Sequence, residues 1–164
     1  GTNTTLNYPK GDDFTVQMFL RMGTAMSSKN GEIFGKWSGN SGAYNYAIRW
    51  AYSTGQMQTK MYNGATCNPT ANNTTPAVSQ VDLLTQRVNW TTNIMDGISS
   101  AGGTIDSNNT INCLSTINNN DNLTLMMRGN NNNWVQGNLI AFLIYNRALS
   151  DAEITQNYDY YLNR

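Results

Sequence analysis

The stretch GNLIAFLIYNRALSDAEITQNYDYYLNR, residues 137–164, combines two elements that together indicate the fold. Its first part, residues 138–146, is apolar at almost every position, so a β-strand here carries hydrophobic side chains on both of its faces. A strand of this kind needs a layer of protein on each side. The sequence therefore predicts that this strand is covered on both faces.

The second part of the stretch carries several signals for the start of a helix. Ser150 is a favourable N-cap residue, and Glu153, three residues later, completes a capping box. Leu149 before the cap and Ile154 after it are placed to form a hydrophobic staple. The spacing then predicts an amphipathic helix of about ten residues. The side chains expected on its apolar face are Ile154, Tyr158 and either Tyr161 or Leu162.

The remaining sequence predicts short strands separated by polar loops. Residues 13–22 alternate, which places Phe14, Val16, Met18, Leu20 and Met22 on one face of a strand and Thr15, Gln17, Phe19 and Arg21 on the other. Further strands are expected at 32–38, 44–52, 55–62, 78–92, 110–117 and 122–129, with loops or glycine turns at 67–76, 96–109, 118–122 and 130–133. We expect an all-β fold: an antiparallel two-sheet sandwich (jelly roll) with one short C-terminal helix, forming a single domain over residues 1–164.

The composition excludes several classes of function. The chain of 164 residues has no net charge and only 12% charged residues, so it lacks the basic surface of a nucleic-acid-binding protein. No apolar run is long enough to enter and span a bilayer. Histidine is absent, which excludes Ser-His-Asp and Cys-His catalysis and histidine metal sites. No signal-peptide pattern is present, and Gly1 in place of Met indicates a processed chain or a piece of a longer one.

Cys67 and Cys113 are the two cysteines of the chain. A disulfide between them closes a loop of about 45 residues and stabilises the fold by about 3–4 kcal/mol. Two separate buried thiols are the alternative. Without histidine, two cysteines cannot form a structural zinc site.

The closing segment, residues 137–158, resembles the C-terminal signature of the laminin-G-like jelly rolls in the concanavalin A-like lectin/glucanase superfamily. The early strand at 13–21, FGKW at 34–37 and NIMDGISS at 93–100 are similar to further positions of that family, the last expected to form a hairpin at its Asp-Gly pair. The ending QNYDYYLNR resembles forms found in phage and other viral structural proteins. The resemblance covers residues 12–160 and implies sugar binding, protein binding, glycoside hydrolysis or a structural role in a virion.

Glycoside hydrolysis is the least favoured of these functions. It needs two carboxylates that face one cleft, about 5 Å apart or further. The acidic residues show no compact alternating motif of that kind; they are Asp12, Asp13, Glu32, Asp82, Asp96, Asp106, Asp121, Asp151, Glu153 and Asp159. Asp12 and Asp13 are adjacent and point to opposite faces of a strand, while Asp151 and Glu153 belong to the helix start. We therefore expect that the protein is not an enzyme.

Calcium is the one cofactor that the sequence suggests. Calcium prefers six to eight oxygen ligands from carboxylates, amides and carbonyls. Asp121 in NNNDN and Asp106 in DSNN are the leading candidate ligands, because laminin-G-like domains often bind calcium at the end of a loop. The alternative is that these Asn and Asp residues form turns without a metal.

Aromatic and amide side chains are candidates for carbohydrate recognition. Sugars stack on aromatic rings and pair their hydroxyls with amides. Trp134, preceded by Asn132 and Asn133, forms one candidate group, and the strand residues Tyr44, Tyr46 and Trp50 form another. For both groups a place in the hydrophobic core is the alternative interpretation, and it is the commoner role of such residues.

The sequence thus favours a non-catalytic surface recognition or decoration module. The leading interpretation is a phage or viral capsid or tail-fibre component that contacts other virion or assembly proteins at the virion surface. The alternative is an extracellular, lectin-like module that binds surface glycans. In both interpretations the loops of a rigid scaffold provide specificity.

Overall fold

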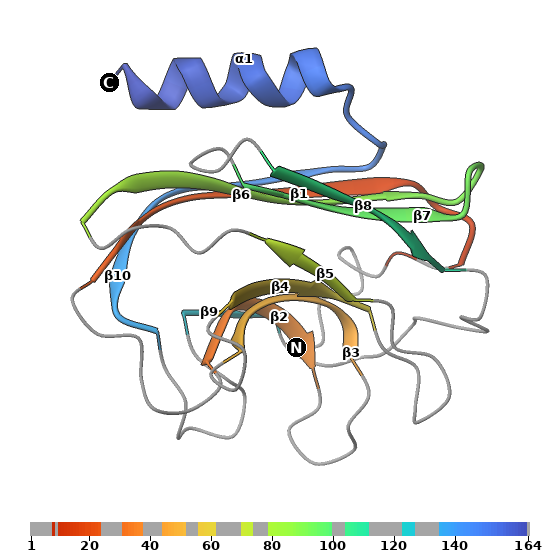
Figure 1. The fold of residues 1–164 in the computed structure, drawn as a ribbon, viewed down its shortest axis with the longest axis horizontal. Helices are drawn as coiled ribbons and strands as arrows, with labels where there is room; N and C mark the ends of the chain where they lie inside the picture. Colours follow the sequence, from red (N-terminus) through yellow and green to blue (C-terminus); the bar gives the residue numbers. More distant parts are fainter. Residues whose placement is uncertain are drawn as a thin grey trace.

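The computed structural model describes residues 8, 10–23, 31–37, 44–51, 56–61, 70–73, 79–99, 104–111, 123–126 and 135–163. Two antiparallel sheets face each other, and one helix lies on the outer side of the first sheet (Figure 1). Sheet A has the order β10 (Gly137–Tyr145), β1 (Phe14–Met22), β6 (Val81–Asn89), β7 (Ile94–Ser99) and β8 (Thr104–Thr110). Sheet B has the order β5 (Thr70–Asn73), β4 (Gln56–Lys60), β3 (Tyr44–Ala51), β2 (Gly31–Trp37) and β9 (Leu123–Leu125). The helix is α1 (Asp151–Leu162), and the predicted β-sandwich with one C-terminal helix is confirmed.

Strand β1 lies between β10 and β6 in sheet A and has both faces buried. The inward-facing set predicted from its alternation, which is Phe14, Val16, Met18, Leu20 and Met22, lies in the core between the sheets. On the opposite face Phe19 packs in a second apolar cluster beneath α1, beside the buried polar side chains of Thr15 and Gln17. The alternation predicted for this strand is confirmed.

Aromatic rings fill the space between the two sheets. Tyr46 of sheet B lies 5.0 Å from Phe14 of sheet A, measured between ring centroids. Phe34 of sheet B lies 5.3 Å from Tyr46 and also 5.3 Å from Phe142 of sheet A. These tilted contacts join the sheets through a continuous apolar layer, and burial of such rings is a large favourable contribution to folding.

Strand β10 is covered on both faces, as its sequence predicts. Leu139, Phe142 and Ile144 pack on the core between the sheets, and Ala141, Leu143 and Tyr145 pack on the cluster beneath α1. The pairing with β1 shifts between Phe19 and Leu20, which are opposite Ala141 and Leu139. Ile140 is therefore the extra residue of a β-bulge, and its side chain is 46% exposed.

The helix start has the predicted capping geometry. The Ser150 hydroxyl accepts from the backbone N–H of Glu153 at 3.3 Å, and the Glu153 carboxylate accepts from the backbone N–H of Ser150 at 2.9 Å. Arg147 donates to both oxygens of the same carboxylate, at 2.9 and 2.6 Å. The Arg147 hydrogen bond, followed by those from Ser150, lowers the pKa of Glu153 to about 2. Leu149 and Ile154 are both buried in the cluster beneath the helix, as the staple predicts.

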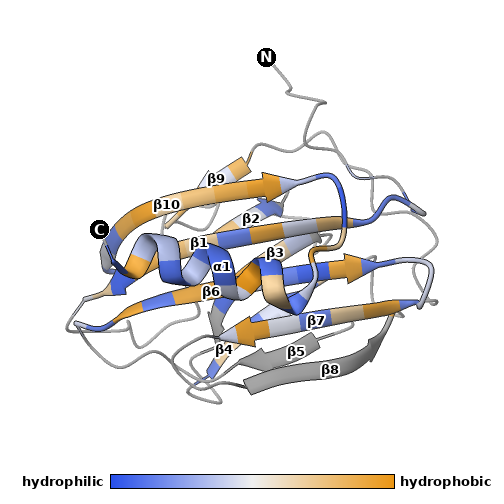
Figure 2. Cartoon of the chain, turned by 90° about the horizontal axis from the view of Figure 1, so that it is seen from above, coloured by the Kyte–Doolittle hydropathy of each residue, from blue (hydrophilic) through white to orange (hydrophobic). Residues whose placement is uncertain are grey.

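Polar groups also fix α1 to sheet A, which it crosses above β1 and β6 (Figure 2). The hydroxyl of Thr15 accepts from the N–H of Leu149 at 3.0 Å and donates to the carbonyl of Arg147 at 2.9 Å. The Asn157 amide donates to Gln17 at 2.6 Å and to the Tyr145 hydroxyl at 3.0 Å. These bonds satisfy polar groups that the helix would otherwise bury without partners.

Three local predictions are wrong. The expected loop at 67–76 contains β5, which pairs with β4. The Asp-Gly pair expected to form a hairpin, Asp96 and Gly97, lies inside β7 opposite Arg87 and Gln86. Residues 106–109, expected in a loop, lie inside β8. In each case pairing with a neighbouring strand satisfies backbone groups and overrides the turn preference of Asn, Asp and Gly.

The cluster beneath α1 predicts the effect of a truncation in the helix. Ile154→Ala should lower the free energy of unfolding by about 2–4 kcal/mol, because it leaves a cavity where a nearly buried side chain packs. Leu162→Ala is the matched control: this side chain is 48% exposed, and we expect a change within about 0.5 kcal/mol. Urea denaturation followed by fluorescence measures both values. Equal losses in the two variants would contradict the packing described for Ile154.

Candidate functional site

The outer face of sheet B, which points away from sheet A, carries a group of polar and charged side chains. Alternate residues of its strands, among them Phe34, Tyr46, Ile48 and Met57, lie in the core between the sheets. The intervening residues must face outward, because successive side chains of a strand point to opposite faces. The strands bend so that this outer face is the hollow side of the sheet (Figure 1).

Arg49 and Gln58 form the centre of this group. They lie directly opposite each other on β3 and β4. The Nε and Nη2 atoms of Arg49 both donate to the Gln58 Oε1 atom, at 3.1 and 2.9 Å. This pair of bonds fixes the plane of the guanidinium against the sheet, so its orientation is set before any ligand arrives.

Glu32 lies beside this pair on the neighbouring strand. It is opposite Arg49 in the pairing of β2 with β3 and is 2% exposed. The register of β2 shifts between Glu32 and Phe34, and after this irregularity Gly35 faces the same side as Glu32. A Cβ atom added at Gly35 would lie 3.1 Å from the Glu32 Oε2 atom and 3.5 Å from the Ala47 Cβ atom. The glycine therefore provides the space that the carboxylate occupies.

Lys60 completes the group at the end of β4. It lies opposite Ala47 and is 8% exposed. Burial, followed by the positive charge of Arg49, lowers the pKa of Lys60 to about 8. The Lys60 backbone carbonyl accepts from the Gln86 Nε2 atom of sheet A at 3.0 Å, which anchors this part of β4 to the other sheet. We refer to Glu32, Arg49, Gln58 and Lys60 as the sheet B patch.

The sheet B patch has the chemistry of a binding surface for polar ligands. It groups two cations, one carboxylate and one amide, which are the donors and acceptors that a ligand with many hydroxyls needs. Arg49 is half-buried, and the other three side chains reach the surface only in small part. Among the residues that the structure describes, Glu32 is the one carboxylate assigned to this face. Glycoside hydrolysis usually needs two carboxylates that face one cleft.

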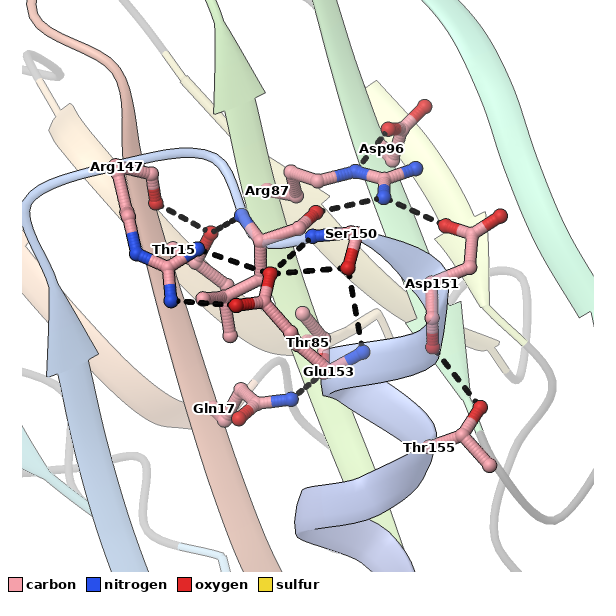
Figure 3. Close-up of polar contacts among 11 residues, drawn as sticks. Thr15, Gln17, Thr85, Arg87, Asp96, Arg147, Ser150, Asp151, Glu153 and Thr155 are labelled. Atoms are coloured by element: carbon pink, nitrogen blue, oxygen red, sulfur yellow. Dashed lines mark hydrogen bonds and ion pairs between the residues drawn. The ribbon is translucent and has the colours of Figure 1, made fainter.

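A second polar cluster surrounds Arg87 at the start of α1 (Figure 3). Its Nε atom donates to Asp96 at 2.7 Å, and its Nη1 atom donates to Asp151 at 2.6 Å and to the carbonyl of Leu149 at 2.9 Å. The hydrogen bonds to Asp151 and Asp96 raise the pKa of Arg87 against the opposing effect of burial. Because Arg87 joins Asp96 of the sheet to Asp151 of the helix, the cluster holds the helix on the sheet. Arg87, Asp96 and Ser150 also line a cavity of about 450 Å³.

The aromatic candidates from the sequence have different outcomes. Tyr46 is fully buried among Tyr8, Phe14 and Phe34, so its ring cannot stack on a sugar, and the core alternative is correct for this residue. Burial also raises its pKa. Tyr44 and Trp50 lie on β3, but their side chains are outside the described part of the structure.

The remaining candidates are not tested by the structure. Trp134, Asn132, Asn133, Asp121, Cys67 and Cys113 lie outside the described residues. Asp106 lies in β8, and its side chain is outside the description too. Within the described ranges no three His, Cys, Asp or Glu side chains are grouped to hold a metal ion. In those same ranges α1 is too short and too polar to cross a membrane. Calcium binding and the disulfide stay predictions.

The members of the sheet B patch were not among the sequence candidates. Alternation in residues 44–52 places Arg49 on the face opposite the aromatic stripe of Tyr46, whereas the candidates predicted on this strand all belong to the stripe. Charged residues make up only 12% of the chain, so a cation in the middle of a strand is an informative signal. Gln58 and Lys60 are two residues apart in QMQTK, so their side chains point to the same face of the strand.

Comparison with known proteins shows the fold. No protein-family model matches the chain, and no curated protein sequence matches it. The binding domain of Paraclostridial Mosquitocidal Protein 1 has a TM-score of 0.72 and 20% identity over 98% of this chain and 40% of that chain. The receptor binding domain of botulinum neurotoxin D has a TM-score of 0.68 and 15% identity over 96% of this chain and 39% of that chain.

A smaller similar structure matches over most of its own length. The CBM40 of a Ruminococcus gnavus IT-sialidase, solved with α2,3-sialyllactose bound, has a TM-score of 0.63 and 13% identity over 89% of this chain and 82% of that chain. The chain thus spans about 40% of these two binding domains and most of the CBM40. At these identities the likeness shows a common β-sandwich fold.

The low pKa of Lys60 predicts a pH-dependent gain in stability on its removal. Its pKa is near 8 in the folded protein and 10.5 in a free side chain, so the unfolded chain binds more protons between these values and wild-type stability rises across that interval. Lys60→Met should be more stable than wild type by about 1–3 kcal/mol at pH 7, with a smaller advantage near pH 10.

Urea unfolding of both proteins at the two pH values measures this difference. The control is Arg21→Met, which removes an exposed cation from sheet A and should change stability by no more than about 0.5 kcal/mol. A Lys60→Met variant that is less stable than wild type at pH 7 would show that burial of the ammonium does not lower the free energy of unfolding.

Proposed function

We propose that the chain is a non-catalytic carbohydrate-binding module that binds a saccharide on the outer face of sheet B. The observation that carries this proposal is the sheet B patch, a fixed group of donors and acceptors on the hollow side of a sheet that α1 does not cover. Saccharides present closely spaced hydroxyls that need such paired donors and acceptors.

The charged side chains of the patch suit the recognition of a ligand more than the stabilisation of the fold. Arg49 and Gln58 bond to each other across the strands, but Lys60 and Glu32 are charged side chains held at low exposure. Buried charges are costly to a fold, and groups with a perturbed pKa gather at functional sites. A preformed polar surface of this type binds with little loss of side-chain freedom.

The similar structures support the lectin-like alternative from the sequence better than the virion interpretation. They are binding domains of two toxins and a sialidase module whose structure holds sialyllactose. A phage or capsid role has no comparable support. The proposal implies that the module works outside the cell, with surface glycans as its partners.

Residues outside the described ranges are candidates to extend the binding surface. Trp134, Asn132 and Asn133 are one such group, and the Tyr44 and Trp50 side chains of β3 are another. Asp121 and Asp106 stay candidate calcium ligands. The sheet B patch is argued independently of all of them.

Binding to a panel of immobilised glycans that includes lactose and 3′-sialyllactose tests the proposal. We expect at least one glycan to bind wild type. Gln58→Ala should weaken that binding by about tenfold, because it releases the Arg49 guanidinium from its fixed orientation. Titration calorimetry with the soluble glycan measures the change.

Asn138→Ala is the matched control, since it removes an exposed amide from β10 of sheet A. We expect it to bind like wild type. If no glycan on the panel binds, or if the two variants weaken binding equally, the outer face of sheet B is not the binding surface.

A further inference from the structure

Arg49 and Lys60 place two positive charges on the same face of neighbouring strands. Arg49 is opposite Gln58, and Lys60 is two residues further along β4. Side chains in such diagonal positions are about 7–8 Å apart at their bases, within reach of long side chains. Burial, followed by the positive charge of Arg49, lowers the pKa of Lys60.

The Arg49 guanidinium has one terminal nitrogen left for a ligand. Its Nε and Nη2 atoms both donate to the Gln58 Oε1 atom. Among the described residues, Nη1 donates to no acceptor. The guanidinium is half-buried and held flat by Gln58, so this nitrogen keeps a fixed direction.

The Lys60 ammonium has no counter-charge in the part of the chain that the structure describes. No carboxylate there lies within ion-pair distance of it. Of the two strands that pair with β4, β3 carries the charged residue Arg49 on this face and β5 has no charged residue. Glu32 lies on β2, one strand beyond β3. Glu32 lies over Gly35 on β2. Lys60 is thus a buried cation beside a second cation, an arrangement that is costly without an anion.

We infer that Arg49 and Lys60 together form a subsite for a negatively charged group of the saccharide. This inference rests on the proposed function and defines its ligand class as acidic glycans that carry a carboxylate or a sulfate. The guanidinium supplies a directed N–H donor and the ammonium supplies a compact charge. An anion bound between them would add a counter-charge beside Lys60, for which the described residues provide none within ion-pair distance.

The titration of Lys60 gives this subsite a pH dependence. An anion beside the ammonium favours its charged form, so binding takes up a proton wherever free Lys60 is partly neutral. The affinity for an acidic glycan should therefore be full at pH 7 and fall by about tenfold toward pH 9.5. Lactose has no charged group, so its affinity should not follow this profile.

Calorimetry with three probes, which are 3′-sialyllactose, lactose 3′-sulfate and lactose, tests the inference. We expect wild type to bind at least one acidic probe about tenfold more tightly than lactose. Lys60→Met should lose this preference although it is the more stable protein, so the loss cannot be attributed to unfolding. Lys60→Arg should keep the preference and lose the pH dependence, and Arg21→Met should behave like wild type.

Two results separate this inference from the proposed function. If lactose and the acidic probes bind equally and Lys60→Met leaves all affinities unchanged, the anionic subsite is wrong while the saccharide-binding function stands. If no probe and no glycan of the panel binds, the proposed function fails and the subsite with it. Preference for the carboxylate or for the sulfate identifies the anion and supports the inference in either case.

Discussion

The burial of both faces of sheet A is the constraint on which the rest of the structure depends. Strands β1 and β10 have apolar side chains on each side, so sheet A needs two partners. Sheet B covers its inner face, and α1 covers its outer face through Leu149 and Ile154. Sheet B needs only one apolar partner, because its outer side is polar. The fold therefore places a polar group of side chains on the side of sheet B that points away from sheet A.

The sequence predicted the elements whose signals are local. The capping box of Ser150 and Glu153 depends on residues three apart, and the alternation of β1 depends on neighbours in the chain, so both were predicted correctly. The predictions for the Asp-Gly pair at 96 and 97 and for the segment 106–109 were wrong, because pairing of β7 with β6 and of β8 with β7 extends both segments as strands. The turn preference of its residues determines the conformation of a segment only where no neighbouring strand pairs with it.

The candidate site was less predictable for a related reason. Alternation divides β3 into two faces but does not say which face meets the other sheet. Tyr46 and Arg49 lie on opposite faces, and the Tyr46 side is the core because Tyr46 contacts Phe14 of sheet A. The apolar side of a strand is the better guess for the inside, and here it leaves Arg49, Gln58 and Lys60 on the outside. Their convergence requires the register of β2, β3 and β4, which a single sequence does not supply.

The bulge at Ile140 has a consequence for the behaviour of the protein at high concentration. Among the strands described, β10 is the last in sheet A, and it is a nine-residue strand rich in Leu, Ile and Phe. An exposed strand of this composition is a template for aggregation by intermolecular pairing. The extra residue breaks the regular spacing of backbone donors and acceptors along β10, so a strand of a second molecule would pair with it less well. The irregularity therefore disfavours aggregation through this strand.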